Sequence, residues 1–461
     1  MVSVTVEDFG PFERAEVEVR PLTIFIGRNS VGKSMLTYLL WSLSSAYPRF
    51  DEVEVGWEEV YRLAEEILSD VKVGRVSREK FESLIGVFHD RVFVEAVRIG
   101  LEERLKYAFG TELRELVRVG RSRARIGVRG ECARMELSVA EALRVEDLDL
   151  CIEMYLKILE LKLLRGGILS ISYDGETEFV SSVADLIKAI IRLFIYYTGF
   201  EFEFLVLGPP TLMSMLPDSR AGIARTLLKP FISPSLLKGV LGVDEEFVST
   251  YFRLAEWLRR NPWVLSNAGP LLDELGVSVD VRFEAGVYNV YVRTWSGKEV
   301  PVSMAPSGVR EVITVVLALL TAGSEEKGGE EIILNTFIEE PEAHLHPRAQ
   351  RALARVIARA VNLGRRVVVT THSDYLISSI NNLILLSQVP KEKLREMGYD
   401  EGEVLSPDDV AVYLVRAEGG KAVVERLRVT EDGIPEDEFT KVVEELLGER
   451  GRIYEALRRG V

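Results

Sequence analysis

The stretch that most constrains this chain runs from Leu22 to Tyr47 and reads "LTIFIGRNSVGKSMLTYLLWSLSSAY". Its first five residues are almost entirely apolar, which predicts a strand buried on both faces. Gly27 and Gly32 allow a tight loop to follow. The apolar spacing after Lys33 then predicts a helix. A buried strand that runs through a glycine-rich loop into a helix indicates an α/β fold.

The loop itself fits the pattern G-x-x-x-x-G-K-[ST] in the context that this motif requires. In such a loop, successive backbone N–H groups point inward around a phosphate, and the helix N-terminus adds its dipole. Lys33 would pair with the β- and γ-phosphates, and the Ser34 hydroxyl would bind Mg²⁺. The alternative is a glycine-rich turn without a ligand. We predict an ATP and Mg²⁺ site with these loop residues: Gly27, Arg28, Asn29, Ser30, Val31, Gly32, Lys33 and Ser34.

A second apolar strand, "EIILNTFIEE", ends in Glu339 and Glu340. An ATPase of this kind needs a carboxylate for Mg²⁺ at the end of a strand beside the loop. We therefore expect Glu339 to hold the metal and Glu340 to polarise the attacking water.

The residues after this strand allow a competing interpretation, because "EEPEAHLHP" is rich in metal-binding side chains. A dedicated metal site would require these groups to converge on one point, which the break at Pro341 makes difficult. The groups in question are Glu339, Glu340, Glu342, His344 and His346.

Two further segments carry candidate site residues. "RRVVVTTHS" predicts a third buried strand, with His372 just past its end, where ligands bind in open α/β sheets. We expect His372 to bond the γ-phosphate or the attacking water. Ser307 and Gly308 begin the apolar helix "SGVREVITVVLALL". They are either a simple N-cap or an anion-binding helix start that completes the site of a second subunit.

Composition limits the class of protein. The chain has 461 residues, a formal net charge of −15 and two cysteines. Such acidity argues against non-specific coating of nucleic acid. Two cysteines form no disulfide framework and suit a reducing cytoplasm. No long apolar run predicts a membrane span, and we see no signal peptide, so we expect a cytoplasmic protein with no membrane partner.

The order of segments predicts an interrupted core. Residues 1–45 and 270–400 would form a P-loop ATPase core, which begins with an antiparallel hairpin. Residues 46–269 would form a largely helical insertion, with a β-hairpin near 115–130 that turns at Gly120. Residues 401–461 would form a strand pair and a helix packed on the core.

Together these segments resemble the ABC-type ATPase heads of the RecF, SMC and OLD group, above all the prokaryotic AAA_15/AAA_21 class related to OLD proteins. "LTIFIGRNSVGKS" resembles their Walker A motif, and "SMAPSGVREVITVVLAL" resembles the signature helix. "FIEEPEAHLHPRAQ" resembles the Walker B motif and D-loop, "VVVTTHSDYLI" the switch histidine, and "LPDSRAGI" an inter-motif stretch that contains Arg220. The Toprim nuclease carboxylates of OLD nucleases have no counterpart after His372.

The resemblance implies a fold class and a mode of action. The fold would be an ABC-type P-loop head with a mixed sheet core, an N-terminal antiparallel β subdomain and a helical insertion. Ser307 and Gly308 would contact ATP bound by a partner subunit, in a head-to-head homodimer that forms on ATP. Three roles stay open: a hydrolysing ATPase, a non-catalytic ATP-gated scaffold for a separately encoded effector such as a nuclease or toxin, and a DNA-repair ATPase. In the last, the DNA-binding edge would be Arg121, Arg123, Arg125 and Arg129.

Overall fold

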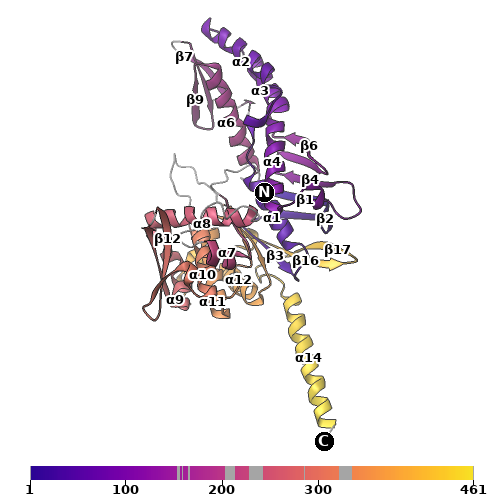
Figure 1. Cartoon of the computed structure of the whole chain (residues 1–461), viewed down its shortest axis with the longest axis vertical. Helices are drawn as coiled ribbons and strands as arrows, with labels where there is room; N and C mark the ends of the chain where they lie inside the picture. Colours follow the sequence, from indigo (N-terminus) through magenta and orange to yellow (C-terminus); the bar gives the residue numbers. More distant parts are fainter. Residues whose placement is uncertain are drawn as a thin grey trace.

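The structure is a computed structural model. It describes residues 2–152, 156–157, 159–164, 167–202, 213–227, 242–284, 286–320 and 335–459. Figure 1 shows a central body, a lobe that contains helices α2, α3 and α6 at one end, and helix α14 projecting from the other end. The predicted strand "EIILNTFIEE" is described only from Asn335 onward; residues 331–334 lie outside the described part.

Eleven strands of the described chain form one mixed sheet, in the order β10-β14-β15-β3-β16-β17-β2-β1-β4-β5-β6. From β10 to β16 neighbouring strands are parallel, whereas β2, β1, β4, β5 and β6 pair antiparallel. The strands are β1 (Val2–Phe9), β2 (Phe12–Val19), β3 (Leu22–Gly27), β4 (Ala124–Arg129), β5 (Arg134–Val139), β6 (Leu143–Asp149), β10 (Met213–Leu216), β14 (Asn335–Glu339), β15 (Arg366–Thr371), β16 (Val410–Glu418) and β17 (Lys421–Leu427). The predicted mixed α/β core with an N-terminal antiparallel part is confirmed.

Two smaller antiparallel sheets stand apart from the main one. The first consists of β7 (Glu160–Leu164), β8 (Ile168–Tyr173) and β9 (Glu176–Val180). The second consists of β11 (Val277–Glu284), β12 (Val287–Thr294) and β13 (Glu299–Pro301).

Helices cover both faces of the main sheet. The α-helices are α1 (Lys33–Ser45), α2 (Trp57–Lys72), α3 (Arg78–Phe88), α4 (Val94–Phe109), α6 (Val183–Glu201), α7 (Arg220–Leu227), α8 (Gly242–Arg260), α9 (Gly269–Leu275), α10 (Ser307–Leu320), α11 (Pro347–Asn362), α12 (Asp374–Leu385), α13 (Lys391–Glu396) and α14 (Asp437–Arg459). Shorter helical turns lie at Phe50–Glu52, His89–Phe93, Leu113–Leu116, Pro262–Ala268, Val302–Met304, Leu386–Gln388, Glu401–Glu403 and Pro407–Asp409.

The alternation of β3 explains why this strand is apolar throughout. Phe25 belongs to the hydrophobic cluster that contains α1, whereas Ile24 and Ile26 belong to the cluster that contains α10, α11 and α12. Successive side chains of a strand point to opposite faces, so a central strand needs apolar residues at every position.

The insertion contains more strand than we expected. We expected residues 137–164 to be helical, but they contain part of β5, all of β6 and β7. In β5, Met135, Leu137 and Val139 are buried at every second position, which is the period of a strand. The hairpin near 115–130 is also shifted, because β4 and β5 turn at residues 130–133 rather than at Gly120.

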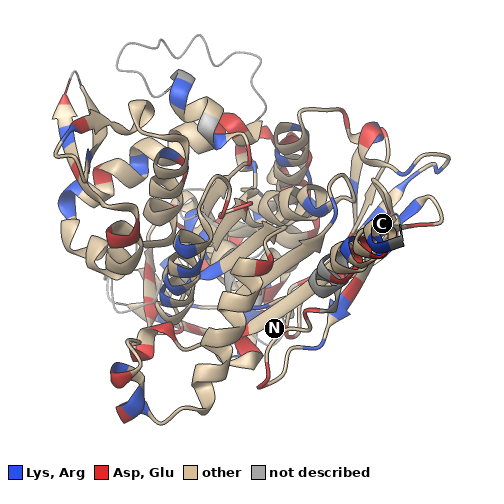
Figure 2. Cartoon of the chain, turned by 90° about the horizontal axis from the view of Figure 1, so that it is seen from below, with Lys and Arg blue, Asp and Glu red and all other residues tan. Residues whose placement is uncertain are grey.

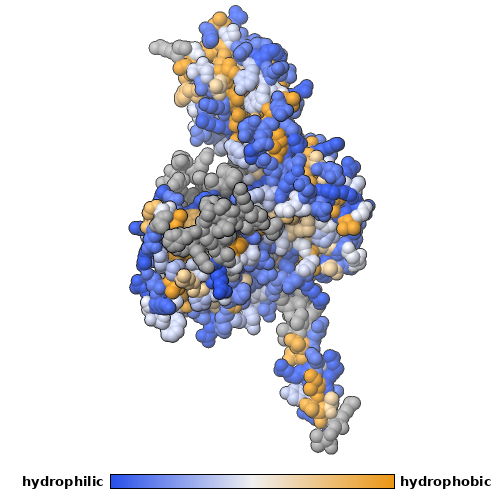
Figure 3. All heavy atoms as spheres, viewed as in Figure 1, coloured by the Kyte–Doolittle hydropathy of each residue, from blue (hydrophilic) through white to orange (hydrophobic). Residues whose placement is uncertain are grey.

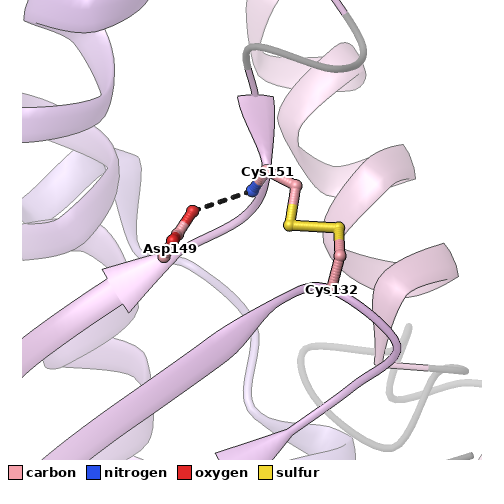
Figure 4. The surroundings of a disulfide bond; sticks show 3 residues. All are labelled: Cys132, Asp149 and Cys151. Carbon is pink, nitrogen blue, oxygen red and sulfur yellow. Dashed lines mark hydrogen bonds between the residues drawn. A yellow bond between two sulfur atoms is a disulfide. The ribbon is translucent and has the colours of Figure 1, made fainter.

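The two cysteines are joined, which corrects the expectation of reduced thiols. Cys132 lies in the turn between β4 and β5, and Cys151 follows β6 (Figure 4). Because β5 and β6 are paired, the two Cα atoms lie 6.2 Å apart, within disulfide range. The backbone N–H of Cys151 donates to Asp149 Oδ1 at 3.0 Å, which holds this strand end beside the turn.

Candidate nucleotide site

The loop after β3 is shaped by residues with positive φ. Gly27 has φ 139°, and a Cβ there would lie 2.1 Å from the carbonyl oxygen of Val415 on β16. Gly32, at the start of α1, has φ 106°, and a Cβ there would lie 2.7 Å from the ring of Phe12. Ser30 also has positive φ, 62°. The neighbouring strands therefore require glycine at both motif positions, and the loop keeps the curvature of a phosphate cradle.

Lys33 spans this loop from within. Its Nζ donates to the carbonyl oxygens of Gly27 at 3.0 Å and Arg28 at 2.8 Å, and lies 2.9 Å from His372 Nε2. An ammonium can only donate, so Nε2 must be the acceptor and the His372 proton lies on Nδ1. Burial lowers the pKa of Lys33, and burial together with the Lys33 charge lowers the pKa of His372, which favours the neutral imidazole.

Parallel pairing brings the three predicted strand ends to one edge. Glu339 on β14 is paired with Thr370 on β15, and Thr371 is paired with Ile26 on β3. The residues that follow these strands therefore meet the glycine loop at the carboxyl edge, where open α/β sheets bind ligands.

Glu339 is buried against helix α1. Its Oε2 accepts from the Tyr38 hydroxyl at 2.9 Å and from the backbone N–H of Asp218 at 3.3 Å, and its carboxylate is also hydrogen-bonded by the Ser34 side chain. Burial raises the pKa of Glu339. Ser34 and Glu339 are thus neighbours, and a hydroxyl beside a carboxylate is an oxygen donor set that suits Mg²⁺. We did not predict Tyr38, although it lies one helical turn after Ser34 and so faces the same side.

Glu340 sits at a strained turn just past β14. Its φ is 42°, and its backbone N–H donates to Thr370 through the carbonyl oxygen at 3.0 Å and through Oγ1 at 3.2 Å. Its side chain is 41% exposed, and Oε1 lies 3.5 Å from His372 Nε2. The strained backbone directs this carboxylate toward the open side of the site, beside the histidine.

Arg220, at the start of α7, is completely buried behind the same strand end. Its guanidinium donates to the carbonyl oxygens of Pro217 at 3.0 Å, Glu339 at 2.5 Å and Glu340 at 2.5 Å. It also lies 3.7 Å from the carboxylate of Glu311 on α10. Arg220 therefore holds the backbone that carries both glutamates.

Glu311 connects this arginine to the loop that follows β14. Its side chain is 1% exposed, and burial raises its pKa. Oε1 lies 2.7 Å from Nδ1 of His344, a residue with φ 59°. Sequence reasoning missed Glu311, because its partners lie far away in the chain.

The remaining candidate ligands point in different directions. Thr371 Oγ1 donates to Glu342 Oε1 at 2.5 Å, and the backbone N–H of His372 donates to the same oxygen at 3.2 Å. His346 Nδ1 instead accepts from the backbone N–H of Arg348 at the start of α11. Within the described residues, no group of three or more His, Cys, Asp or Glu side chains is arranged to hold a metal ion. The competing five-residue metal site is not formed.

Ser307 and Gly308 begin α10, which belongs to the hydrophobic cluster opposite that of α1. Ser307 is exposed. A Cβ on Gly308 would lie 2.6 Å from the carbonyl oxygen of His344, so the helix start packs closely on the loop after β14.

The arginines of residues 118–129 have acidic partners in several places. Arg121 lies 3.2 Å and Arg118 3.7 Å from Asp8, and Arg125 lies 3.6 Å from Glu7. Figure 2 shows basic and acidic residues intermixed over the visible face. These pairs favour a solvated strand face over a DNA-binding edge.

The fold and site define an α/β protein with a glycine loop and strand-end acids at one edge of its sheet. Residues 252–377 match the family described as the AAA ATPase domain, so this part of the chain is an AAA ATPase domain. The matched range contains α10, β14 and β15, while the glycine loop lies outside it.

Solved structures with similar arrangements include SMC heads. One is the SMC head bound to the C-winged helix domain of ScpA (10% identity, TM-score 0.44, 93% of this chain and 98% of that one). A second is the Pyrococcus furiosus SMC head with an extended coiled coil (9%, 0.42, 97% and 100%). A third is the Thermotoga maritima SMC head domain (11%, 0.36, 93% and 98%). No match was found among curated proteins. Among the described residues, no helix is long and apolar enough to cross a membrane.

Proposed function

We propose that the protein is an ATP-binding, ATP-hydrolysing ABC-type ATPase of the OLD and RecF-like class. The observation that carries this proposal is the convergence of Lys33, Glu339 and His372, from three parallel strand ends, on the glycine loop. The AAA ATPase domain of residues 252–377 supports the same activity class.

The loop residues would hold the phosphates of ATP. Lys33 would exchange its bonds with the Gly27 and Arg28 carbonyls for phosphate oxygens, which are stronger acceptors. Ser34 and Glu339 would hold Mg²⁺, whose bound form neutralises charge on the phosphates. The Tyr38 hydroxyl would keep the Glu339 carboxylate oriented.

Glu340 and His372 would act on the attacking water. Glu340 is the one of the two strand-end glutamates whose side chain is 41% exposed, so it can accept a proton from a water molecule on the open side. His372, with its proton on Nδ1, presents Nε2 to Lys33 and would orient the γ-phosphate or the water.

Ser307 and Gly308 would act on a second subunit. Ser307 is exposed at an α10 helix start, where backbone N–H groups and the helix dipole favour an anion. We propose a head-to-head homodimer that forms on ATP, in which each α10 completes the site of the partner.

The test is equilibrium ATP binding by Lys33→Ala and the oligomeric state of Glu340→Gln. Lys33→Ala should lose ATP binding, whereas Lys421→Ala, which removes an exposed lysine paired with Glu13, should bind like wild type. Glu340→Gln should bind ATP and stay dimeric, whereas Glu418→Gln should not. A Glu340→Gln variant that is saturated with ATP and no more dimeric than without it would contradict the ATP-dependent dimer.

A second candidate function is an ATP-gated scaffold for a separately encoded effector. It is favoured by the lobe of α2, α3 and α6, which projects away from the body that carries the site (Figure 1). Copurification from the native host tests it. Robust turnover by protein that brings no partner would count against it.

A further inference from the structure

Helix α14 presents an apolar stripe on its surface. Five of its large apolar side chains are between 53% and 62% exposed, and they lie at helical spacings of three, four and seven. These residues are Leu446, Leu447, Ile453, Tyr454 and Leu457. Figure 3 shows the stripe as an orange band along the projecting helix. A stripe of this kind on an amphipathic helix indicates a surface that another helix can cover.

The charges of α14 are segregated along its length. Residues 444–449 carry three glutamates and no basic residue, whereas residues 450–458 carry three arginines and one glutamate. The glutamates are Glu444, Glu445 and Glu449; the second segment has Arg450, Arg452, Glu455 and Arg458. A parallel pair of such helices would place like charges side by side, while an antiparallel pair places opposite charges side by side.

We infer that α14 pairs with α14 of a second copy of this chain, in antiparallel orientation and without a need for nucleotide. The complementary charges are in the helix itself, so a second copy supplies both the apolar stripe and the matching ends. This contact is separate from the ATP-dependent dimer proposed above.

The spacing of the stripe selects a register. Leu446 would lie opposite Leu457 of the partner subunit, so that each stripe covers the other. In the same register Glu444 would lie beside Arg458 of the partner subunit, and Glu449 beside Arg452 of the partner subunit. Arg450 lies within the stripe, where its aliphatic stem covers apolar surface and its charged end reaches water.

The first experiment measures association of nucleotide-free protein by sedimentation velocity over a range of concentrations. Wild type should form a dimer as the concentration rises. Leu457→Glu should be monomeric and should still bind ATP like wild type. Glu444→Arg and Arg458→Glu should each weaken the dimer, roughly 5-fold for two exposed ion pairs, and the double variant should restore it. Wild type that stays monomeric throughout, or a dimer that Leu457→Glu leaves intact, overturns the inference.

The second experiment determines the orientation by cross-linking. Both native cysteines are joined to each other, so an introduced cysteine is the single free thiol. A mixture of Glu444→Cys and Arg458→Cys proteins should cross-link with a short bismaleimide, and each protein alone should not. In the antiparallel register two copies of either position are about 20 Å apart along the helix axis, at 1.5 Å per residue. Cross-linking of each variant with itself would mean a parallel pair and overturn the inference.

Discussion

The guanidinium of Arg220 donates to the carbonyl oxygen of Glu340 at 2.5 Å, and so ties a buried cation to the backbone of the proposed general base. The same cation faces the buried carboxylate of Glu311, 3.7 Å away. Burial lowers the pKa of Arg220, so the arginine is stabilised there only by acceptors that surround it.

Arg220→Met should therefore destabilise the fold strongly. The substitution leaves the Glu311 carboxylate with less compensation and two strand-end carbonyls without a donor, for which about 3–5 kcal/mol is expected. Urea denaturation measures this change. The control is Arg225→Met, an exposed arginine on the same helix, which should change stability by less than about 0.5 kcal/mol. Equal losses from both variants would contradict the structural role of Arg220.

Gly308→Ala should also destabilise the protein, because the new Cβ would lie 2.6 Å from the His344 carbonyl oxygen. Backbone must move to accommodate it, which costs about 1–3 kcal/mol. The matched control is Gly222→Ala in α7, where no atom lies within 4 Å of the added Cβ. That variant should gain about 0.5–1 kcal/mol from helix propensity. Thermal or urea unfolding of both variants shows whether the signs are opposite; a gain in both would be inconsistent with the close packing.

Stability should depend on pH through His372. Burial and the Lys33 charge lower its pKa in the folded state, so the unfolded chain binds this proton at a higher pH than the folded chain. The contribution of His372 is therefore complete above the ordinary histidine pKa and is lost as pH falls toward the lowered value. Unfolding of wild type and His372→Asn at about pH 7.5 and about pH 5.5 isolates this effect. Wild type should lose more stability than the variant; a pH-independent difference between them would exclude it.

Replacing Cys132 and Cys151 with serine should destabilise the protein by about 3 kcal/mol, because the disulfide closes a loop between positions 19 apart. Reductant should destabilise wild type similarly and leave the double variant unchanged. Wild type that reacts with a thiol reagent before reduction would show that the bond is absent.

The strand ends and glycine loop could be predicted because their signals are local in sequence. Residues Leu22 to Ile26 are apolar at every position, and Gly27 and Gly32 stand at motif spacing, so each segment indicated its own structure. Parallel pairing then placed Glu339 and His372 at one edge, as expected from the order of the strands.

The supporting contacts could not be predicted in the same way. Tyr38 and Arg220 reach Glu339 across 301 and 119 positions of the chain, and no local pattern encodes such contacts. The leucines of residues 137–164 fit helical spacing as well as strand alternation, and pairing of β5 with β4 and β6 decided in favour of strands. The same pairing brought Cys132 to Cys151.

The most direct test of the proposed ATPase is phosphate release from ATP and Mg²⁺ by wild type and by Lys33→Ala, with Lys421→Ala as the control. Wild type and the control should release phosphate at the same rate. Lys33→Ala should release it about 100-fold more slowly or less, because the phosphates lose the cation that the loop is built around. Phosphate release by Lys33→Ala at the wild-type rate would contradict the assignment of this site.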